Sequence, residues 1–204
     1  MISRTQRILF WLLLVSSVVM SVTLLRLRER AHDRLLATAD TLSPSLPVES
    51  RPQSVTLMIA NDMDGSMYAA VRLLPLPADR NARAHVVLQR LIQEYAQPGS
   101  PHPIAPNNGV SGVFFMPLSA PENSGRPGVL AVVDLSESFA AAHPSGIEPE
   151  MLTLLSILGT LHANFPEIDQ VRFLVGGQPR ETLAGHADLS RAYLASDAPG
   201  IKHL

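Results

Sequence analysis

Cysteine is absent from this chain of 204 residues, and lysine occurs only once, as Lys202 among 16 basic residues. Without cysteine the protein can form no disulfide bond, thiolate metal site, cysteine nucleophile, covalent haem attachment or cysteine-linked lipid anchor. Aromatic residues are also scarce, at 5% of the chain. The sequence therefore excludes the functions that depend on a thiol.

An excess of positive charge is absent too. The formal net charge is −2, from 16 basic and 18 acidic residues. Residues 1–50 carry six arginines and four acidic residues, whereas residues 51–204 carry ten basic and fourteen acidic residues. Nucleic-acid binding needs clustered lysine and arginine, so a mildly acidic body argues against a nucleic-acid partner. The length predicts one domain with a short accessory segment.

A long hydrophobic run is present near the N-terminus. Residues 8–25 are 18 residues without a charged side chain. At about 1.5 Å per residue such a helix spans roughly 27 Å, close to the hydrocarbon thickness of a bilayer. Arg4 and Arg7 precede the run, and Trp11 lies near its start, where indole rings favour the membrane interface. The run predicts a single transmembrane helix in contact with the lipid bilayer.

A cleavable signal peptide is the alternative for the same segment. Its apolar core is shorter, about 7–15 residues, and a small-residue cleavage site follows closely. Here Arg26 follows at once, and the nearest triplet of that kind, Ala37-Thr38-Ala39, lies 12 residues beyond Leu25. This spacing favours a retained anchor.

The flanking charges do not fix the orientation of the anchor. Two arginines lie in the tail of residues 1–7, and four follow the run, at Arg26, Arg28, Arg30 and Arg34. A literal count by the positive-inside rule places the carboxyl side in the cytoplasm. A short tail with two arginines is, however, also typical of a cytoplasmic N-terminus with an exported body. Both orientations stay open on the residues alone.

The rest of the chain divides into a linker, a body and a tail. Residues 26–53 begin with helix-forming residues and continue with Pro44, Pro47 and Pro52, which favour an extended chain. This segment is expected to be a helical stalk and a proline-rich linker. Residues 54–197 are expected to form the globular domain, and residues 198–204 a C-terminal tail.

Apolar alternation, turn residues and helical spacing predict the elements of the body. Strands are expected at 55–59, 67–74, 110–118, 129–135 and 171–175, helices at 81–95 and 149–164, and a short returning strand or tail at 180–195. This order predicts an α/β (α+β) fold in which one mixed sheet carries two helices packed on one face.

The turn after the first expected strand resembles a calcium loop only in part. Asp62 and Asp64 precede Gly65. Position twelve of the corresponding loop is Val71, where a bidentate glutamate is required. The segment therefore predicts a hairpin turn and no metal.

The histidines do not form a metal motif either. No two of the seven have the i, i+4 spacing of a helical metal site. His186 and Asp188 are two residues apart, and two ligands do not make a zinc site. Gly176-Gly177 precedes Gln178-Pro179 and no helix, so no phosphate loop is expected. We expect no metal and no cofactor.

A nucleophilic site can be assembled only from scattered residues. Asp134, Ser136 and one of the histidines could form a hydrolase triad, but the segment 109–112 is one residue short of a nucleophile elbow. Hydroxyl and carboxylate groups at a strand end normally cap the next segment. We expect no catalytic residue, and a membrane-tethered hydrolase is the alternative.

The body contains several short motifs in a fixed order. The run 131–139 has two valines, Asp, Leu and Ser followed by Phe, and the segments 146–166, 171–177 and 181–190 come after it. In this order the motifs resemble those of the GerMN domain family of sporulation and spore-germination proteins. The resemblance covers about residues 54–195. The matching residues are Gly65, Arg72, Asp134, Ser136, Phe139, Thr160, Phe165, Pro166, Gly177, Gly185, His186 and Asp188.

This resemblance implies a non-enzymatic module of the bacterial cell envelope that binds a protein or an envelope component. It favours a body outside the cytoplasm, periplasmic or external, and a structural role for the matching residues. An apolar or aromatic patch such as Phe114, Phe115 or Tyr193 would contact the partner. A ligand-sensing extracytoplasmic domain is a further alternative.

Overall fold

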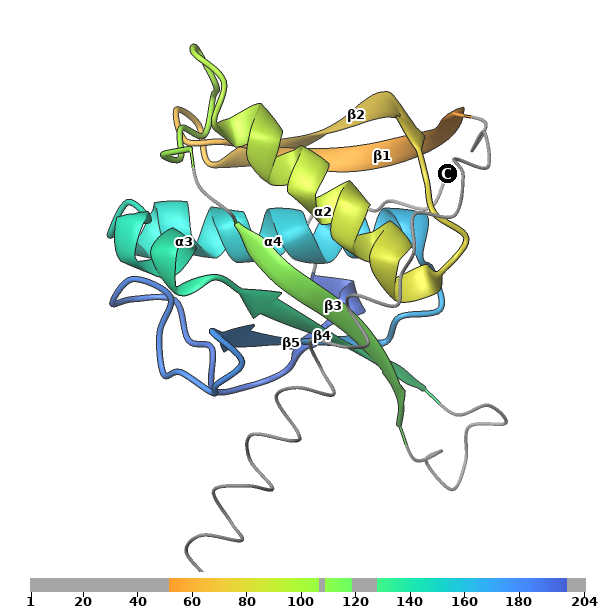
Figure 1. Ribbon diagram of the computed structural model, residues 1–204. Helices are drawn as coiled ribbons and strands as arrows, with labels where there is room; N and C mark the ends of the chain where they lie inside the picture. Colours follow the sequence, from red (N-terminus) through yellow and green to blue (C-terminus); the bar gives the residue numbers. More distant parts are fainter. Residues whose placement is uncertain (1–51, 107–108, 119–127, 198–204) are drawn as a thin grey trace, which may run out of the picture. The chain divides into compact units, whose positions relative to one another are not determined.

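The computed structural model describes residues 52–106, 109–118 and 128–197 (Figure 1). Along the chain the elements are β1 (Pro52–Asn61), β2 (Ser66–Pro75), α2 (Arg80–Tyr95), β3 (Val110–Pro117), β4 (Val129–Leu135), α3 (Glu137–Ala142), α4 (Ile147–Asn164), β5 (Gln170–Val175), β6 (Tyr193–Leu194) and the 3-10 turn η1 (Ala195–Asp197). This content confirms the α+β class.

The segments expected to reach the membrane lie outside the described residues. They comprise the tail 1–7, the transmembrane helix 8–25 and nearly all of the stalk and linker 26–53. The C-terminal tail 198–204 lies outside them as well. Within the part of the chain that the structure describes, no helix has the length and apolar character to cross a bilayer.

The first two strands form a regular antiparallel hairpin. Their register runs without interruption from the Pro52–Pro75 pair to the Asn61–Ser66 pair. In the turn, Asp64 accepts hydrogen bonds from the backbone N–H and the hydroxyl of Ser66, and Gly65 supplies a φ of 66°. The expected hairpin turn is therefore confirmed.

The other strands form a separate four-stranded sheet in the order β3-β4-β5-β6. β3 pairs antiparallel with β4, β4 parallel with β5, and β5 antiparallel with the two-residue β6. A parallel pair needs a crossover connection, and α3 and α4 lie between β4 and β5 in the chain. The register shifts between Val110 and Gly112, where β3 carries an irregularity.

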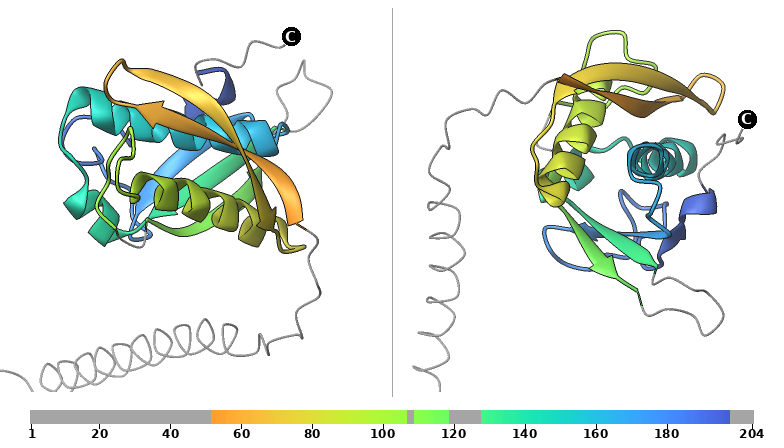
Figure 2. Two further views of the ribbon diagram at one scale, coloured as in Figure 1. Left: turned by 90° about the horizontal axis from the view of Figure 1, so that it is seen from above. Right: turned by 90° about the vertical axis from the view of Figure 1, so that its right-hand side faces the viewer.

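The expectation of one mixed sheet with two helices is wrong in two respects. The strands form two sheets, and the helices α2 and α4 lie in a layer between them (Figure 2). In the segments that the structure describes, side chains of the helices, and no third strand, bind the outer edge of β1. The Asn164 amide accepts from Thr56 N–H (3.0 Å) and donates to Thr56 C=O (2.7 Å), and Thr160 Oγ1 accepts from Met58 N–H (2.9 Å).

The second difference is α3, a helix of six residues that follows β4. The Ser136 hydroxyl caps it by accepting the Phe139 N–H at 3.1 Å, and Phe139 is fully buried. Six residues are fewer than two helical turns, which is too short for apolar periodicity in the sequence to predict this helix.

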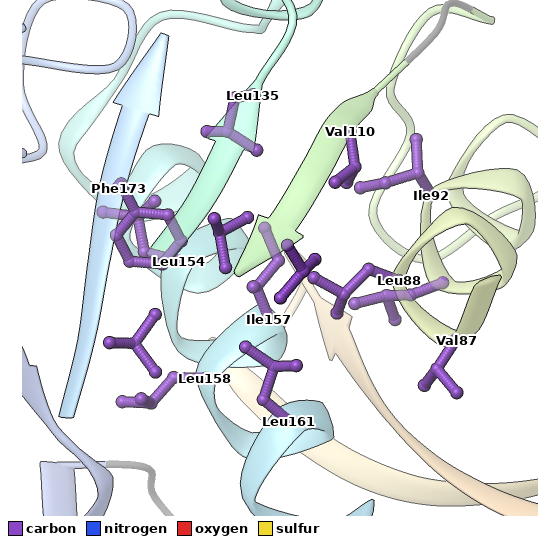
Figure 3. Close-up of a cluster of buried hydrophobic side chains, with 14 of the residues drawn as sticks. Val87, Leu88, Ile92, Val110, Leu135, Leu154, Ile157, Leu158, Leu161 and Phe173 are labelled. Atoms are coloured by element: carbon purple, nitrogen blue, oxygen red, sulfur yellow. The ribbon is translucent and has the colours of Figure 1, made fainter. Parts of the chain in front are cut away.

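The core lies between the helices and the larger sheet (Figure 3). Leu154, Ile157 and Leu158 of α4 pack toward Leu135 and Phe173 of the sheet, and all five are at most 1% exposed. α4 is buried on almost every side, because the hairpin covers the face that the sheet leaves free. A fully enclosed helix must find partners for its polar side chains as well as its apolar ones.

The Asn164 side chain gives a test of the two-sheet arrangement. Asn164→Ala removes the amide that pairs with Thr56, which leaves a part-buried N–H and C=O without partners. We expect a loss of about 1–3 kcal/mol in the free energy of unfolding. Urea denaturation of the full-length protein, followed by far-UV circular dichroism, measures it. Ala163→Ser, at the neighbouring exposed position, is the control and should change stability little. Equal stability of both variants would contradict this account of the β1 edge.

Candidate functional site

Two residues of the hypothetical hydrolase triad lie at the end of β4 and form hydrogen bonds that hold nearby backbone segments. Asp134 Oδ1 accepts the Gly177 N–H at 2.7 Å and so fixes the turn after β5, where Gly176 and Gly177 have φ of 59° and 73°. The Ser136 hydroxyl caps α3 and contacts Ser138 Oγ at 3.0 Å. No histidine of the described residues hydrogen-bonds to Ser136. Ser136 thus caps the segment that follows β4, as expected, whereas Asp134 binds the more distant turn after β5.

Gly185, His186 and Asp188 lie in a loop that folds around the carboxylate of Glu150. Glu150 is fully buried in the first turns of α4. Its Oε2 accepts the backbone N–H groups of Ala184, His186 and Ala187 at 3.0, 3.0 and 2.8 Å. Its Oε1 accepts the Gly146 N–H at 3.1 Å and contacts His186 Nδ1 at 3.0 Å.

These contacts decide the charge of Glu150. Burial acts to raise the pKa of this carboxyl group, but the N–H groups of Ala187 and Ala184, the His186 ring and the Gly146 N–H together lower its pKa from 4.5 to about 2. The carboxylate is therefore ionised at neutral pH, at the positive end of the α4 dipole. It binds the loop 183–187 to the start of α4 and has no capacity left for a substrate or a metal.

Glu150→Gln tests this role. The glutamine NH₂ group would face backbone donors, so we expect a loss of about 2–3 kcal/mol in the free energy of unfolding at pH 7. Because the folded-state pKa is lowered, the contribution of Glu150 is present above about pH 4.5 and is lost as the pH falls toward 2. The difference between wild type and variant should shrink over that range. Urea titrations at pH 7, 4 and 3 measure it, with Glu148→Gln as the control on the same turn. If the difference in the free energy of unfolding between wild type and Glu150→Gln did not depend on pH, the structural role of the Glu150 carboxylate would be refuted.

The remaining family-motif residues also have structural contacts. Arg72 binds Glu94 with two hydrogen bonds, at 3.0 and 3.2 Å. Thr160 holds β1, and Phe165, which is buried at the end of α4, packs against Phe115 at a ring distance of 5.4 Å. Pro166 follows it on the surface. None of these side chains converges on another to form a catalytic group.

A buried polar chain was missed by sequence reasoning. His102 contacts Asp62 through Nδ1 and Thr153 Oγ1 through Nε2 at 2.7 Å. His143 Nε2 contacts the same hydroxyl at 2.8 Å, and its Nδ1 donates to the Pro144 C=O at 2.8 Å. The five residues come from the β1–β2 turn, the loop after α2, the loop after α3 and α4. No sequence spacing links them, although Thr153 in an otherwise apolar helix is a weak signal.

The buried polar chain contains the residue types of a catalytic triad, but a substrate could not reach them. Thr153 is completely buried, and its hydroxyl also lies 3.0 Å from the Pro149 C=O. Burial lowers the pKa of His143. A nucleophile must reach a substrate atom, and a hydroxyl enclosed by two imidazoles and a carbonyl cannot. The chain instead ties three loops to α4.

A surface is left as the candidate functional site: the outer face of the β3-β4-β5 sheet. The side chains of these strands alternate, so Val113, Val133 and Phe173 are buried against the helices. Their neighbours point the other way, and Phe114 and Met116 are each 52% exposed. We call this surface the outer sheet face. Its members are Phe114, Met116, Leu130, Val132, Asp134, Arg172 and Leu174.

Of the three aromatic residues expected to form a partner patch, Phe114 alone is exposed. Phe115 is half-buried beneath Arg80, whose guanidinium lies 4.0 Å from the ring centre. Tyr193 is 1% exposed and packs against Phe173. The expectation for Phe115 and Tyr193 is therefore wrong, because each belongs to the other side of its strand. Among the described residues, no three metal-ligating side chains come together.

Comparison with known proteins places this fold in a family. The model of the family Germane, described as sporulation and spore germination, matches residues 56–181. This is more than half of the chain, so the protein belongs to the sporulation and spore-germination family that contains the GerMN domains. A comparison with curated proteins gives no match.

Solved structures include similar chains. The tandem GerMN domains of the sporulation protein GerM from Bacillus subtilis are 19% identical, with a TM-score of 0.45, and the match covers 72% of this chain and 47% of that one. A putative lipoprotein from Clostridium perfringens is 21% identical, with a TM-score of 0.36 and coverage of 73% and 91%. This chain thus spans about half the length of the tandem-domain protein.

Proposed function

We propose that this protein is a non-enzymatic binding module of the bacterial cell envelope, anchored in the membrane by residues 8–25, with its folded body outside the cytoplasm. The observation that carries the proposal is the outer sheet face. It presents the half-exposed Phe114 and Met116 beside three part-buried apolar side chains, and its two charged residues are Arg172 and Asp134, whose Oδ1 is bound to the Gly177 N–H. Contiguous exposed apolar surface of this kind marks interaction sites on soluble domains.

The contacts of the polar groups support a non-enzymatic role. Asp134, Ser136, Glu150 and Thr153 each hold a backbone segment or a buried ring in place. A catalytic group needs a free reacting atom beside its partners. In these four residues the atoms that could react are already engaged in the fold.

The shape of the outer sheet face indicates its partner. The face is mainly apolar, and Arg172 is its exposed charged residue, since Asp134 is part-buried and bound to the Gly177 N–H. A protein surface with an apolar centre and an acidic or hydroxyl group opposite Arg172 would match it, whereas the polar polymers of the cell wall would not. We therefore propose a protein partner rather than a glycan.

The double variant Phe114→Ser, Met116→Ser tests the surface. Both side chains are half-exposed, so the variant should fold, but it removes the apolar centre of the face. We expect the yield of chemically crosslinked partner, captured with the full-length protein from intact cells, to fall about tenfold or more. Met63→Ser, at a position that is 93% exposed on the β1–β2 turn, is the control and should leave the yield unchanged. An unchanged yield for the double variant would exclude this face as the interface.

The orientation is tested separately. Protease is added to cells whose envelope is opened while the cytoplasmic membrane stays intact. We expect the body of the full-length protein to be degraded and a cytoplasmic marker protein to survive. Degradation of the body only after lysis of the membrane would place it in the cytoplasm and overturn the exported arrangement.

A further inference from the structure

The described sheets have three long outer edges, and side chains of the helices bind the backbone of two of them. On β1, Asn164 and Thr160 bind the backbone of Thr56 and Met58, and the Tyr95 hydroxyl accepts the Ala60 N–H at 3.0 Å. On β3, Asn81 Oδ1 accepts the Phe115 N–H at 3.3 Å, and the His85 ring binds the Val110 C=O at 2.9 Å, both from α2. An open edge exposes unpaired N–H and C=O groups, and these side chains satisfy several of them on β1 and two of them on β3.

The third edge belongs to β2 and is open. In β1 the N–H groups of Thr56, Met58 and Ala60 point away from β2. Backbone direction alternates along a strand, so the residues between and beside these three are the ones that form hydrogen bonds to β2. The β2 residues opposite those neighbours are Tyr68, Ala70 and Arg72. The outward groups are therefore those of Met67, Ala69, Val71 and Leu73. In the described part of the chain, the sole hydrogen bond to them is from Arg72 Nη1 to the Val71 C=O, at 3.0 Å.

The usual devices that block an open edge are missing from β2. Its ten residues keep an unbroken register with β1, so no bulge twists the edge away. Proline occurs only at its last position, Pro75, and lysine does not occur. The one charge, Arg72, is bound to Glu94 of α2. A long, regular edge without an unpaired charge is suited to pairing with another strand.

We propose that β2 pairs antiparallel with β2 of a second copy of this chain, about a twofold axis at Ala70. In this register Ala69 lies opposite Val71 of the second copy, and Met67 lies opposite Leu73. The outward N–H and C=O groups of all four residues then find partners.

The side chains fit the same register. Val71 and Leu73, which are 61% and 70% exposed, would meet small or apolar residues across the axis. Arg72 would lie opposite Tyr68 of the second copy, so no like charges would face each other. Cross-strand apolar and cation–aromatic pairs each stabilise a sheet. This self-complementarity is what an interface with twofold symmetry requires, and it selects a second copy over an unrelated strand.

The pairing would join two hairpins into one four-stranded sheet. Two-stranded hairpins are marginal on their own, and additional strands stabilise them. The outer sheet face is not involved, so self-association and partner binding use different surfaces.

A single cysteine tests the register, because the chain has none of its own. Ala70→Cys places two thiols directly opposite each other at a pair without hydrogen bonds, where the Cα atoms lie about 4.5 Å apart, within the range of a disulfide. The full-length protein is oxidised in its native membranes and separated on a non-reducing gel. We expect about tenfold more disulfide-linked dimer than for Ser54→Cys, an exposed control position in β1.

Two further variants, each combined with Ala70→Cys, keep the test decisive. Val71→Pro removes an outward N–H, and Val71→Lys places two like charges beside the axis without altering the backbone. Both should lower the dimer yield about tenfold, while Val71→Thr should not. The proposal is overturned if Ala70→Cys gives no more dimer than Ser54→Cys, if both Val71→Pro and Val71→Lys leave the yield unchanged, or if Ala70→Cys links mainly to a different protein.

Discussion

Helix α4 is enclosed on nearly every side, and the rest of the structure depends on how its polar side chains are satisfied. Asn164 and Thr160 bind the edge of β1, Thr153 joins two histidines from separate loops, and Glu150 gathers the backbone of residues 184–187. An enclosed polar group without a partner costs about 1–3 kcal/mol. These contacts therefore fix the positions of the hairpin and of three loops around one helix, and apolar packing fills the space between them.

The same constraint accounts for the structural contacts of the family-motif residues. A buried helix that carries hydroxyl and carboxylate groups could in principle form an active site, but here each group has a backbone partner. The function that we propose therefore uses the outside of the molecule. Two kinds of surface are left: an apolar sheet face and an open strand edge. Both are suited to other polypeptides, because one offers apolar area and the other offers backbone hydrogen bonds.

Much of the fold could be predicted from the sequence, since it depends on local patterns. The strands at 55–59, 67–74, 110–118, 129–135 and 171–175 all correspond to observed strands, and both expected helices are present within a few residues of their observed ends. The family could be predicted as well, because the order of short motifs around Asp134, Thr160 and Gly177 is specific even though each motif is weak.

The errors have a common physical origin. In the two-sheet arrangement Asn164 binds Thr56, a contact 108 residues apart in the chain, and no periodicity encodes it. The buried polar chain that links Asp62 to His143 through hydrogen bonds is likewise formed by residues that meet only after folding. The roles of Phe115 and Tyr193 were misjudged because which side of a strand faces the core is decided by packing.

The 108-residue separation between Thr56 and Asn164 also bears on how the chain reaches its native state. β1 and β2 emerge during synthesis before the other described elements, and long before the helix that covers them. Contacts so distant in sequence close late and slow folding, and during that interval the apolar side of the hairpin is unprotected. A body with this topology cannot complete its core until α4 and the strand β5 that follows it have been released.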